Sequence, residues 1–324
     1  MDAKQIERAR RRLRLRDLET LVAVVQAGGM RKASVELHLS QPAVSKAMRE
    51  LEDALGLKLL ERGRRGVEAT PFGAALVRRS KALIDDVQTA LRELADLADP
   101  EAGEVHLGAM ETLQAGVVAA AAQVQLKRHP RMRLFFELGQ SPDLINHFLP
   151  QRLVDAVIAR PMSTTLPAEV EGETLFHDQL RVAVGPEHPL ARRRKPKLEN
   201  LLDEHWILSR NEVMPGTPVP VAFAQAGLPF PERVITSGSI NMRQNMLASG
   251  RFVTCVPHSL LPFARVRGNF HILPIELPLW PVPTMILKLR ARALSPAAES
   301  FLATLREISE PLGTTPAKRR KQPR

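Results

Sequence analysis

The sequence lacks the features of disulfide-bonded, membrane-spanning and secreted proteins. A single cysteine, Cys255, among 324 residues excludes an intramolecular disulfide and any metal site built from several cysteines. No uninterrupted apolar run approaches twenty residues, so no membrane span is expected. Residues 1–12 lack the apolar core of a secretory signal. Together these absences favour a cytoplasmic protein.

Signatures of catalysis are also missing. There is no serine nucleophile elbow and no glycine-rich phosphate loop. Four of the nine histidines show no metal-ligand spacing with one another, namely His38, His129, His188 and His258. We therefore expect neither an enzyme nor a cofactor. Cys255 lies in an apolar strand, and we expect a core residue there rather than a redox sensor, which needs an exposed thiol of low pKa.

The net charge of +11 is concentrated at the two ends of the chain. Residues 1–98 hold 19 basic and 14 acidic residues, and residues 318–324 hold five basic and no acidic ones. Residues 99–317 are nearly neutral, with 22 basic and 21 acidic residues. A cationic N-terminal module suits a polyanion, and a neutral body suits a small molecule or a protein contact. Solvated, unstructured charge is the alternative for residues 8–16 and our expectation for the tail.

Residues 31–55 predict two short helices joined by a tight turn. Ser40 can cap the second helix, and Pro42 falls in its first turn. The inward apolar stripe is predicted at Val44, Ala47, Met48 and Leu51. The outward polar face is predicted at Gln41, Ser45, Lys46, Arg49 and Glu52. A polar, net-basic face on a helix entered through a helix-turn suits a DNA major groove, and a solvated helical hairpin is the alternative.

The segments around this pair extend the same interpretation. A helix over 15–28 would pack behind it, and residues 56–70 predict a wing of two strands. Arg62, Arg64 and Arg65 at the wing tip would meet phosphates or enter a minor groove. A long helix begins at Thr70 and Pro71. It carries a heptad seam at Leu76, Ser80, Leu83, Val87, Ala90, Leu94 and Leu97, which favours dimerisation over packing on its own domain.

From residue 104 onward strands alternate with helices, which predicts parallel sheets in an α/β domain. Strands are expected at 105–108, 133–138, 155–159, 180–184, 206–208, 233–236, 252–256 and 282–289. Helices are expected at 112–127, 141–152, 219–226, 241–248 and 296–309. The pattern indicates two lobes with a ligand between them, because helix N-termini then converge on one cleft. The strand at 282–289 is expected to return to the first lobe.

The order of these parts resembles the LysR-type transcriptional regulators over residues 15–309. The resemblance is most specific in 39–45 and 51–62, and residues 70–73 resemble the start of the family's linker helix. Met30-Arg31 and Leu60 depart from the family pattern without upsetting it. The resemblance implies an α-helical winged helix-turn-helix DNA-binding domain at 1–70 and a linker helix at 71–98. A two-lobed, periplasmic-binding-protein-like α/β effector domain then covers 99–310, with a basic disordered tail at 311–324. Lobe I is expected at 104–178 and 281–310, and lobe II at 179–280.

What the family implies is a homodimer or homotetramer bound at an interrupted palindrome of double-stranded DNA, with a small-molecule effector changing the complex. By matching positions, Gln41, Pro42, Ser45 and Lys46 would face base edges and backbone, and Arg49 a phosphate. RNA polymerase is a further expected partner. A weaker resemblance to regulators of aromatic-acid or sugar catabolism suggests an aromatic acid or a sugar-related metabolite as effector.

The expected effector residues lie where strands meet helices, and they are Thr112, Ser141, Arg160, Thr217 and Ser239. Thr112 can equally be a helix cap. Glu111 beside this pocket would repel an anionic effector unless Arg160 or Arg243 offsets it, so a neutral or polyol effector stays open. Two other functions compete with this interpretation. One is a periplasmic-type solute-binding protein, and the other is a ligand-independent, low-specificity DNA-binding protein.

Overall fold

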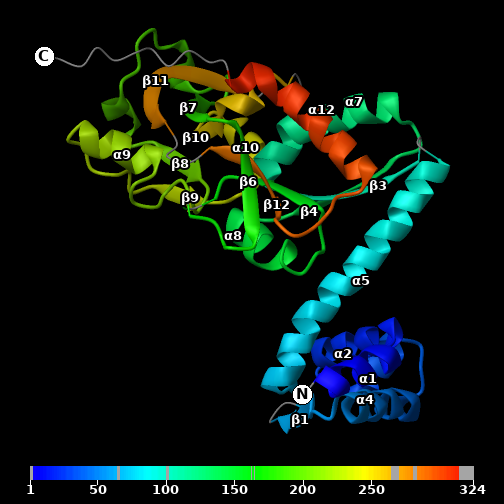
Figure 1. The fold of residues 1–324 in the computed structure, drawn as a ribbon. Helices are drawn as coiled ribbons and strands as arrows, with labels where there is room; N and C mark the ends of the chain where they lie inside the picture. Colours follow the sequence, from blue (N-terminus) through cyan, green and yellow to red (C-terminus); the bar gives the residue numbers. More distant parts are fainter. Residues whose placement is uncertain are drawn as a thin grey trace, which may run out of the picture. The chain divides into compact units, whose positions relative to one another are not determined.

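The chain divides into two units, Met1–Leu94 and Ala95–Arg324, which are described here one at a time (Figure 1). The computed structural model describes residues 3–63, 66–99, 102–161, 163, 165–263, 270–279 and 283–313. None of the helices in these ranges is long and apolar enough to cross a membrane.

The N-terminal unit is a small helical module with a two-stranded wing. Its elements are α1 (Ala3–Arg12), α2 (Leu15–Ala27), α3 (Met30–Glu36), α4 (Gln41–Leu55), β1 (Leu60–Gly63), β2 (Gly66–Ala69) and α5 (Pro71–Ala98). The first helix shows that the basic residues up to Arg12 are not unstructured, since Glu7 pairs with Arg10 and Arg11 one turn away.

The boundaries of α2 and α4 follow from capping chemistry. Ser40 accepts a hydrogen bond from the Ala43 N–H at 3.3 Å, as predicted for the N-cap of α4. Gly28 and Gly56 end α2 and α4 with φ angles of 67° and 66°, a left-handed conformation that glycine adopts without strain. Ser40 thus fixes the start of α4 after α3, Gly28 separates α2 from α3, and Gly56 separates α4 from the wing.

A single apolar cluster holds this unit together. The buried members are Leu21, Val24, Ala33, Val44, Met48, Leu51, Leu59 and Val77. Three of the four residues predicted for the inward stripe of α4 are buried, and Ala47 packs at the edge. The wing joins this core, because the Val67 N–H donates to the Gly28 carbonyl at the end of α2. Thr70 caps α5 by accepting from the Gly73 N–H at 3.1 Å.

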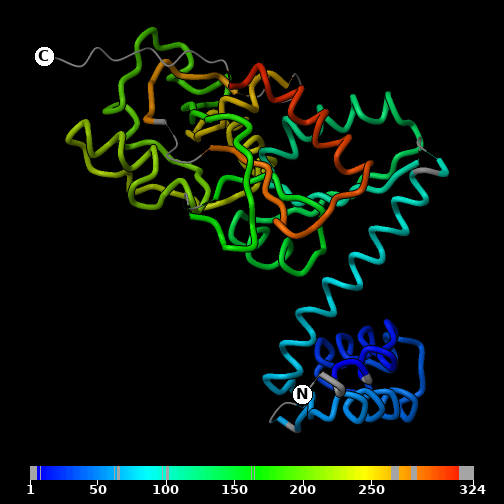
Figure 2. The backbone as a smooth tube through the Cα atoms, viewed as in Figure 1, coloured from blue at the N-terminus to red at the C-terminus, as the bar shows by residue number. Residues whose placement is uncertain are grey.

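The second unit contains two five-stranded sheets, which define its lobes. Lobe I has the strand order β4-β3-β5-β12-β6, and lobe II the order β11-β7-β10-β8-β9. The strands of lobe I are β3 (Glu104–Ala109), β4 (Arg133–Leu138), β5 (Ala156–Ala159), β6 (Val170–Phe176) and β12 (Thr284–Leu289). Those of lobe II are β7 (Gln179–Val184), β8 (His205–Leu208), β9 (Val234–Thr236), β10 (Phe252–Pro257) and β11 (His271–Leu279). The chain enters lobe II between β6 and β7 and returns to lobe I with β12, as predicted (Figure 2).

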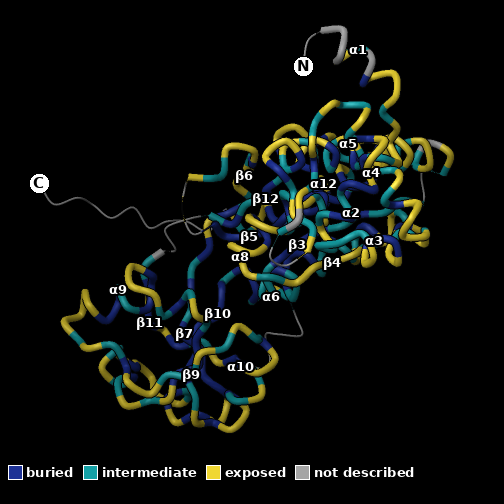
Figure 3. Tube along the Cα trace, turned by 90° about the horizontal axis from the view of Figure 1, so that it is seen from below, coloured by how far each residue is buried: buried dark blue, intermediate teal, exposed yellow. Residues whose placement is uncertain are grey.

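Helices cover both faces of each sheet, so that the central strands are buried (Figure 3). In lobe I these are α6 (Glu111–Leu113), η1 (Gln114–Val118), α7 (Ala119–Arg128), α8 (Ser141–Asp143), η2 (Leu144–Phe148) and α12 (Pro296–Gly313). In lobe II they are η3 (Pro189–Arg192), η4 (Leu198–Leu201), α9 (Pro218–Gln225), α10 (Ile240–Leu247) and η5 (His258–Leu260). Alternate residues of β3 and β5 share one apolar cluster with residues of α12. Cys255 is fully buried in the cluster between the lobe II sheet and α9, which confirms that it is a core residue.

The structure corrects four predictions about these elements. Both sheets are mixed rather than parallel, because β12 runs antiparallel to β5 and β6, and β7 antiparallel to β10 and β11. The edge strands β6 and β11 were not predicted at all. The helix expected at 112–127 is interrupted at Gly116, whose φ of −109° and ψ of −108° are not helical. The helix expected at 141–152 ends at Phe148, ahead of Arg152 with its left-handed φ of 59°.

Candidate functional site

The outer face of α4 is the candidate DNA-contacting surface. Gln41, Pro42, Lys46 and Arg49 are exposed on it. Lys46 lies 3.7 Å from Glu50, one turn along, but both side chains are more than half exposed. Such a pair contributes little to stability, so Lys46 remains available to a phosphate or a base edge.

Two residues predicted for this face are engaged within the unit. Ser45 is half-buried and its hydroxyl donates to the Met30 sulfur at 3.1 Å. Glu52 does not point outward as predicted, because its carboxylate accepts from the N–H groups of Leu59 and Leu60 at 2.7 and 3.1 Å. Lys58 adds an ion pair at 3.2 Å. Burial opposes ionisation of Glu52, but these donors outweigh it and lower the pKa of the carboxyl below its usual value. Glu52 therefore attaches α4 to the wing.

The side chain of Arg62, together with Arg64, Arg65 and the tail from 314 onward, lies outside the described residues. The predicted phosphate contacts of the three arginines therefore stay predictions.

A small cavity of about 50 Å³ lies between the two lobes. Its lining comes from both lobes and includes Met110, Glu111, Thr112, Gln140, Arg160, Leu180, Ser209, Asn211, Glu212, Gly238, Arg243 and Pro257. We call this cavity the interlobe pocket. Thr112 and Arg160 thus stand where a ligand of this pocket would contact them. Thr112 is not a helix cap, since the N-cap of α6 is Met110.

The other three predicted effector residues are engaged elsewhere. Ser141 is fully buried and donates to the sulfur of Met110 at 3.2 Å. The Thr217 hydroxyl donates to backbone carbonyls, the shorter bond being 2.6 Å to Met214. Ser239 caps α10 by accepting from the Met242 N–H at 3.3 Å. None of the three belongs to the lining of the pocket. Their assignment to a ligand therefore gains no support from the geometry.

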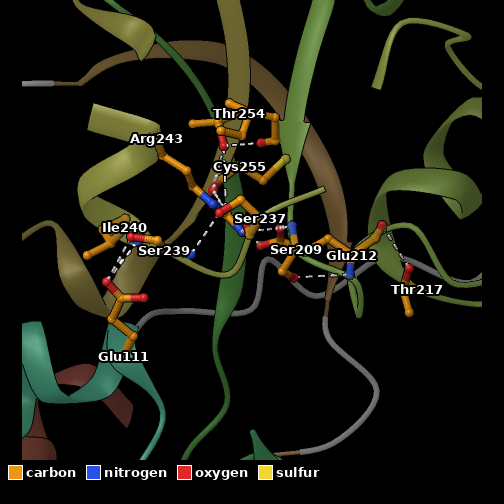
Figure 4. Close-up of polar contacts among 11 residues, drawn as sticks. Glu111, Ser209, Glu212, Thr217, Ser237, Ser239, Ile240, Arg243, Thr254 and Cys255 are labelled. Atoms are coloured by element: carbon orange, nitrogen blue, oxygen red, sulfur yellow. Dashed lines mark hydrogen bonds and ion pairs between the residues drawn. The ribbon is translucent and has the colours of Figure 1, made fainter. Parts of the chain in front are cut away.

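The pocket also contains a buried ion pair that sequence reasoning missed. Arg243 is 2% exposed, and its guanidinium reaches Glu212 at 2.8 and 3.3 Å (Figure 4). It donates further to the carbonyls of Cys255 at 2.8 Å and Ser237 at 3.2 Å. Glu212 follows the carboxyl end of β8. Because ligands of α/β sheets bind at the carboxyl ends of strands, this position in the sequence could have identified Glu212 as a pocket residue.

Arg160 is neutralised in the same way. It follows β5 and pairs with Asp178 at 2.5 Å, and both side chains are more than nine-tenths buried. Asp178 also accepts from the backbone N–H and the hydroxyl of Ser259. Because these partners come from separate segments, the sequence places Arg160 near the pocket but does not reveal its counterion.

The single thiol of the chain, that of Cys255, is expected to be unreactive in the folded protein. Burial raises the pKa of Cys255 well above its ordinary value, and the nearby charge of Glu212 adds to that rise. A thiol with a raised pKa forms little thiolate, which is the reactive species.

A DNA-reading helix-turn-helix module and a two-lobed domain with a pocket between its lobes together define a ligand-responsive transcriptional regulator. Residues 15–74 match the family described as bacterial regulatory helix-turn-helix protein, lysR family, and residues 98–309 match the LysR substrate binding domain. The chain belongs to the LysR family of transcriptional regulators, with a DNA-binding and an effector-binding domain.

Relatives with known names support this assignment over most of the chain. The HTH-type transcriptional regulator GbpR of Azospirillum brasilense is 30% identical over 305 residues, covering 92% of this chain and 87% of that protein. A hydrogen peroxide-inducible genes activator of Dickeya chrysanthemi is 26% identical, covering 82% of this chain and 86% of that protein. The structure of a full-length OxyR variant from Pseudomonas aeruginosa superimposes with a TM-score of 0.61 at 23% identity. It covers 96% of this chain and 99% of that one, and this likeness concerns the fold alone.

Proposed function

We propose that this protein binds double-stranded DNA at an interrupted palindrome, with the outer face of α4 in the major groove. The observation that carries the proposal is the exposed set of Gln41, Lys46 and Arg49 on a helix whose opposite face is buried in the apolar core of its unit. Glutamine can pair with adenine, and lysine or arginine with guanine or a phosphate. Pro42 and Ser45 would approach the backbone beside them.

A two-fold symmetric site requires a two-fold symmetric protein, so we propose a homodimer or homotetramer that pairs through α5. Apolar side chains on α5 are exposed, namely Leu83 at 49%, Val87 at 41%, Leu91 at 61% and Leu94 at 63%. Leu83, Val87 and Leu94 belong to the predicted heptad seam, whereas Leu91 lies beside it. Ser80, which was also predicted for the seam, is buried. The proposed division of the chain is 1–70, 71–98, 99–310 and 311–324, except that α12 continues to Gly313, three residues past the predicted end of the effector domain.

The interlobe pocket is the proposed effector site, with Thr112 and Arg160 as ligand contacts. A sugar-related metabolite or an aromatic acid is the proposed effector, and RNA polymerase a proposed partner. Binding to chromosomal DNA would place the protein in the cytoplasm. The relatives named for peroxide induction do not extend that role to this chain, because its single thiol is buried and has a raised pKa.

The first experiment is capture of sheared genomic DNA by the purified full-length protein, followed by mapping of the bound fragments at two salt concentrations. A regulator is expected to select a few sites with two-fold-related half-sites that persist at the higher salt. Operons beside those sites would nominate effectors to test in the same assay.

Diffuse binding that disappears at the higher salt would contradict the proposal. It would favour a ligand-independent, low-specificity DNA-binding protein, whose affinity comes from counterion release alone. A variant with Gln41, Lys46 and Arg49 all changed to alanine is the control, because it removes the proposed contacts without touching the apolar core.

A further inference from the structure

Glu111 of lobe I forms a hydrogen bond to lobe II at the interlobe pocket (Figure 4). Glu111 begins α6 in lobe I, and its Oε1 accepts from the backbone N–H of Ile240 at 3.0 Å. The hydroxyl of Ser239 lies 3.5 Å from the same oxygen. Ile240 is the first residue of α10 in lobe II, a helix of eight residues. The unpaired N–H groups and the dipole of a helix N-terminus bind anions. Here the protein supplies that anion from its own side chain.

Among the described residues that line the pocket, no arginine is left without a carboxylate partner. Arg243 is paired with Glu212, and Arg160 is paired with Asp178. An anionic ligand would therefore meet two neutralised guanidiniums and the carboxylate of Glu111. Burial of an extra charge without a partner is strongly unfavourable.

The pocket also presents uncharged hydrogen-bonding groups to a ligand. The amides of Gln140 and Asn211 and the hydroxyl of Thr112 complete the polar lining. Amides and hydroxyls both donate and accept, which matches a ligand that carries several hydroxyl groups.

We propose that Glu111 replaces a ligand carboxylate in the interlobe pocket, so that the pocket takes uncharged, hydroxyl-rich ligands of the monosaccharide or polyol class. The inference rests on the proposed role of this pocket as the effector site. The cavity is far smaller than the roughly 300–1,000 Å³ of ordinary ligand pockets. Entry of a sugar therefore has to widen the pocket, and the bond between Glu111 and Ile240 links that widening to the arrangement of the two lobes.

The test uses acetate as the probe, because acetate reproduces the carboxylate of Glu111. The thermal midpoint of the full-length protein is measured in increasing sodium acetate, with sodium chloride holding the ionic strength constant. The wild type is expected to show no acetate-specific change. Glu111→Ala is expected to melt lower in chloride and to gain about 2–4 °C in acetate, with saturation. Glu111→Gln is expected to respond weakly, since its amide fills the same space. Glu137→Ala, which removes an exposed carboxylate of lobe I, is the matched control.

Two results would overturn the proposal. One is an equal acetate effect on the wild type, which would mean that the anion site is open. The other is a folded Glu111→Ala variant, judged by wild-type circular dichroism, that does not respond to acetate. If Glu111→Ala does not fold, Glu111→Ser undergoes the same titration with the same expected outcomes.

The ligand class is tested on the wild type with matched pairs, such as glucose with gluconate and xylose with xylonate. In any pair that raises the midpoint, the neutral sugar is expected to raise it more, and the reverse order would overturn the proposal. These titrations contain no DNA, whereas the capture experiment does not depend on Glu111. Failure of the DNA-binding proposal and failure of the ligand inference are therefore distinguishable.

Discussion

The cations of the two units are used in opposite ways. On α4, Lys46 and Arg49 are exposed on a helix face that nothing in their unit covers. Around the interlobe pocket, Arg160 and Arg243 are more than nine-tenths buried, and each is paired with a buried carboxylate. An exposed cation can exchange its counterions for DNA phosphates, whereas a buried, paired cation offers only hydrogen bonds. The presence of an arginine or lysine therefore does not show that a site binds anions. Whether the cation is already paired with a carboxylate of the protein decides it.

The sharpest test of this contrast removes one buried cation. Arg243→Met leaves Glu212 charged, buried and unpaired, so the free energy of unfolding is expected to fall by about 3–5 kcal/mol. Urea unfolding of lobe II can be followed through Trp206, which is fully buried there, with Trp280 replaced by phenylalanine in every variant. Unfolding of the helical N-terminal unit is followed by circular dichroism. Lys46→Met on α4 is expected to stay within about 0.5 kcal/mol. Similar losses of unfolding free energy in the two variants would contradict the contrast between buried, paired cations and exposed ones.

A second test addresses the exposed apolar side chains of α5. Changing Val87 and Leu94 to glutamate places like charges in the proposed seam, so the dimer is expected to dissociate to monomers in sedimentation velocity experiments. Gln88→Glu, with a charge at an exposed position outside the seam, is expected to leave the mass unchanged. An unchanged mass in the double variant would place the interface elsewhere.

A third test separates two kinds of contact on α4. Gln41→Ala is expected to weaken binding to a captured site by about 1–3 kcal/mol while leaving random DNA unaffected, because a lost base contact removes discrimination. Lys46→Ala is expected to weaken binding to both DNAs and to reduce the salt slope by about one. Fluorescence anisotropy at several salt concentrations measures both quantities. Equal losses on both DNAs for Gln41→Ala would show that it contacts the backbone.

Glu52 of α4 resembles the charged residues of the pocket, because its carboxylate is engaged by partners within its own unit. Glu52→Ala leaves the N–H groups of Leu59 and Leu60 without their acceptor, and we expect a loss of about 1–3 kcal/mol at neutral pH. Because folding lowers the pKa of Glu52, its ionised form stabilises the fold above the ordinary glutamate pKa of about 4.3. That contribution disappears as the pH falls through the lowered value. The difference between wild type and Glu52→Gln is therefore expected to shrink in acid, and a difference independent of pH would contradict this assignment.

The smallest effect is expected at Cys255. Its thiol is buried and has a raised pKa, so treatment of the folded protein with hydrogen peroxide should leave DNA affinity unchanged. The free thiol should react with Ellman's reagent only after denaturation. A peroxide-dependent change in affinity that Cys255→Ser abolishes would make this residue a sensor.

Local signals predicted the N-terminal unit well. The cap at Ser40 and the stripe of Val44, Met48 and Leu51 act within one or two turns of α4. Such interactions connect residues that are close in the sequence, so their spacing can be read directly. Glu52 is the exception, because its partners lie seven and eight residues away across a turn.

The sheets of the second unit were less predictable at their edges. Strand β11 contains Pro274 and Pro278 and pairs with β7 through shifts in register, which hides the usual strand pattern. Strand β6 lies at the edge of lobe I, and most of its residues are partly or fully exposed. Strand direction depends on the distant return of β12 and on the pairing of β7 with β10 and β11. An alternation of strands and helices does not encode those pairings.

Periodicity and caps formed by near neighbours were enough to predict the helix-turn-helix, the long α5 with its apolar stripe and the two-lobed α/β architecture. The chemistry of the pocket depends instead on contacts between distant segments. Glu111 meets Ile240 across 129 positions, and Arg243 meets Glu212 across 31. Whether a buried charge is free or neutralised depends on which distant segments the fold brings together, and that neutralisation sets the class of ligand that the pocket can accept.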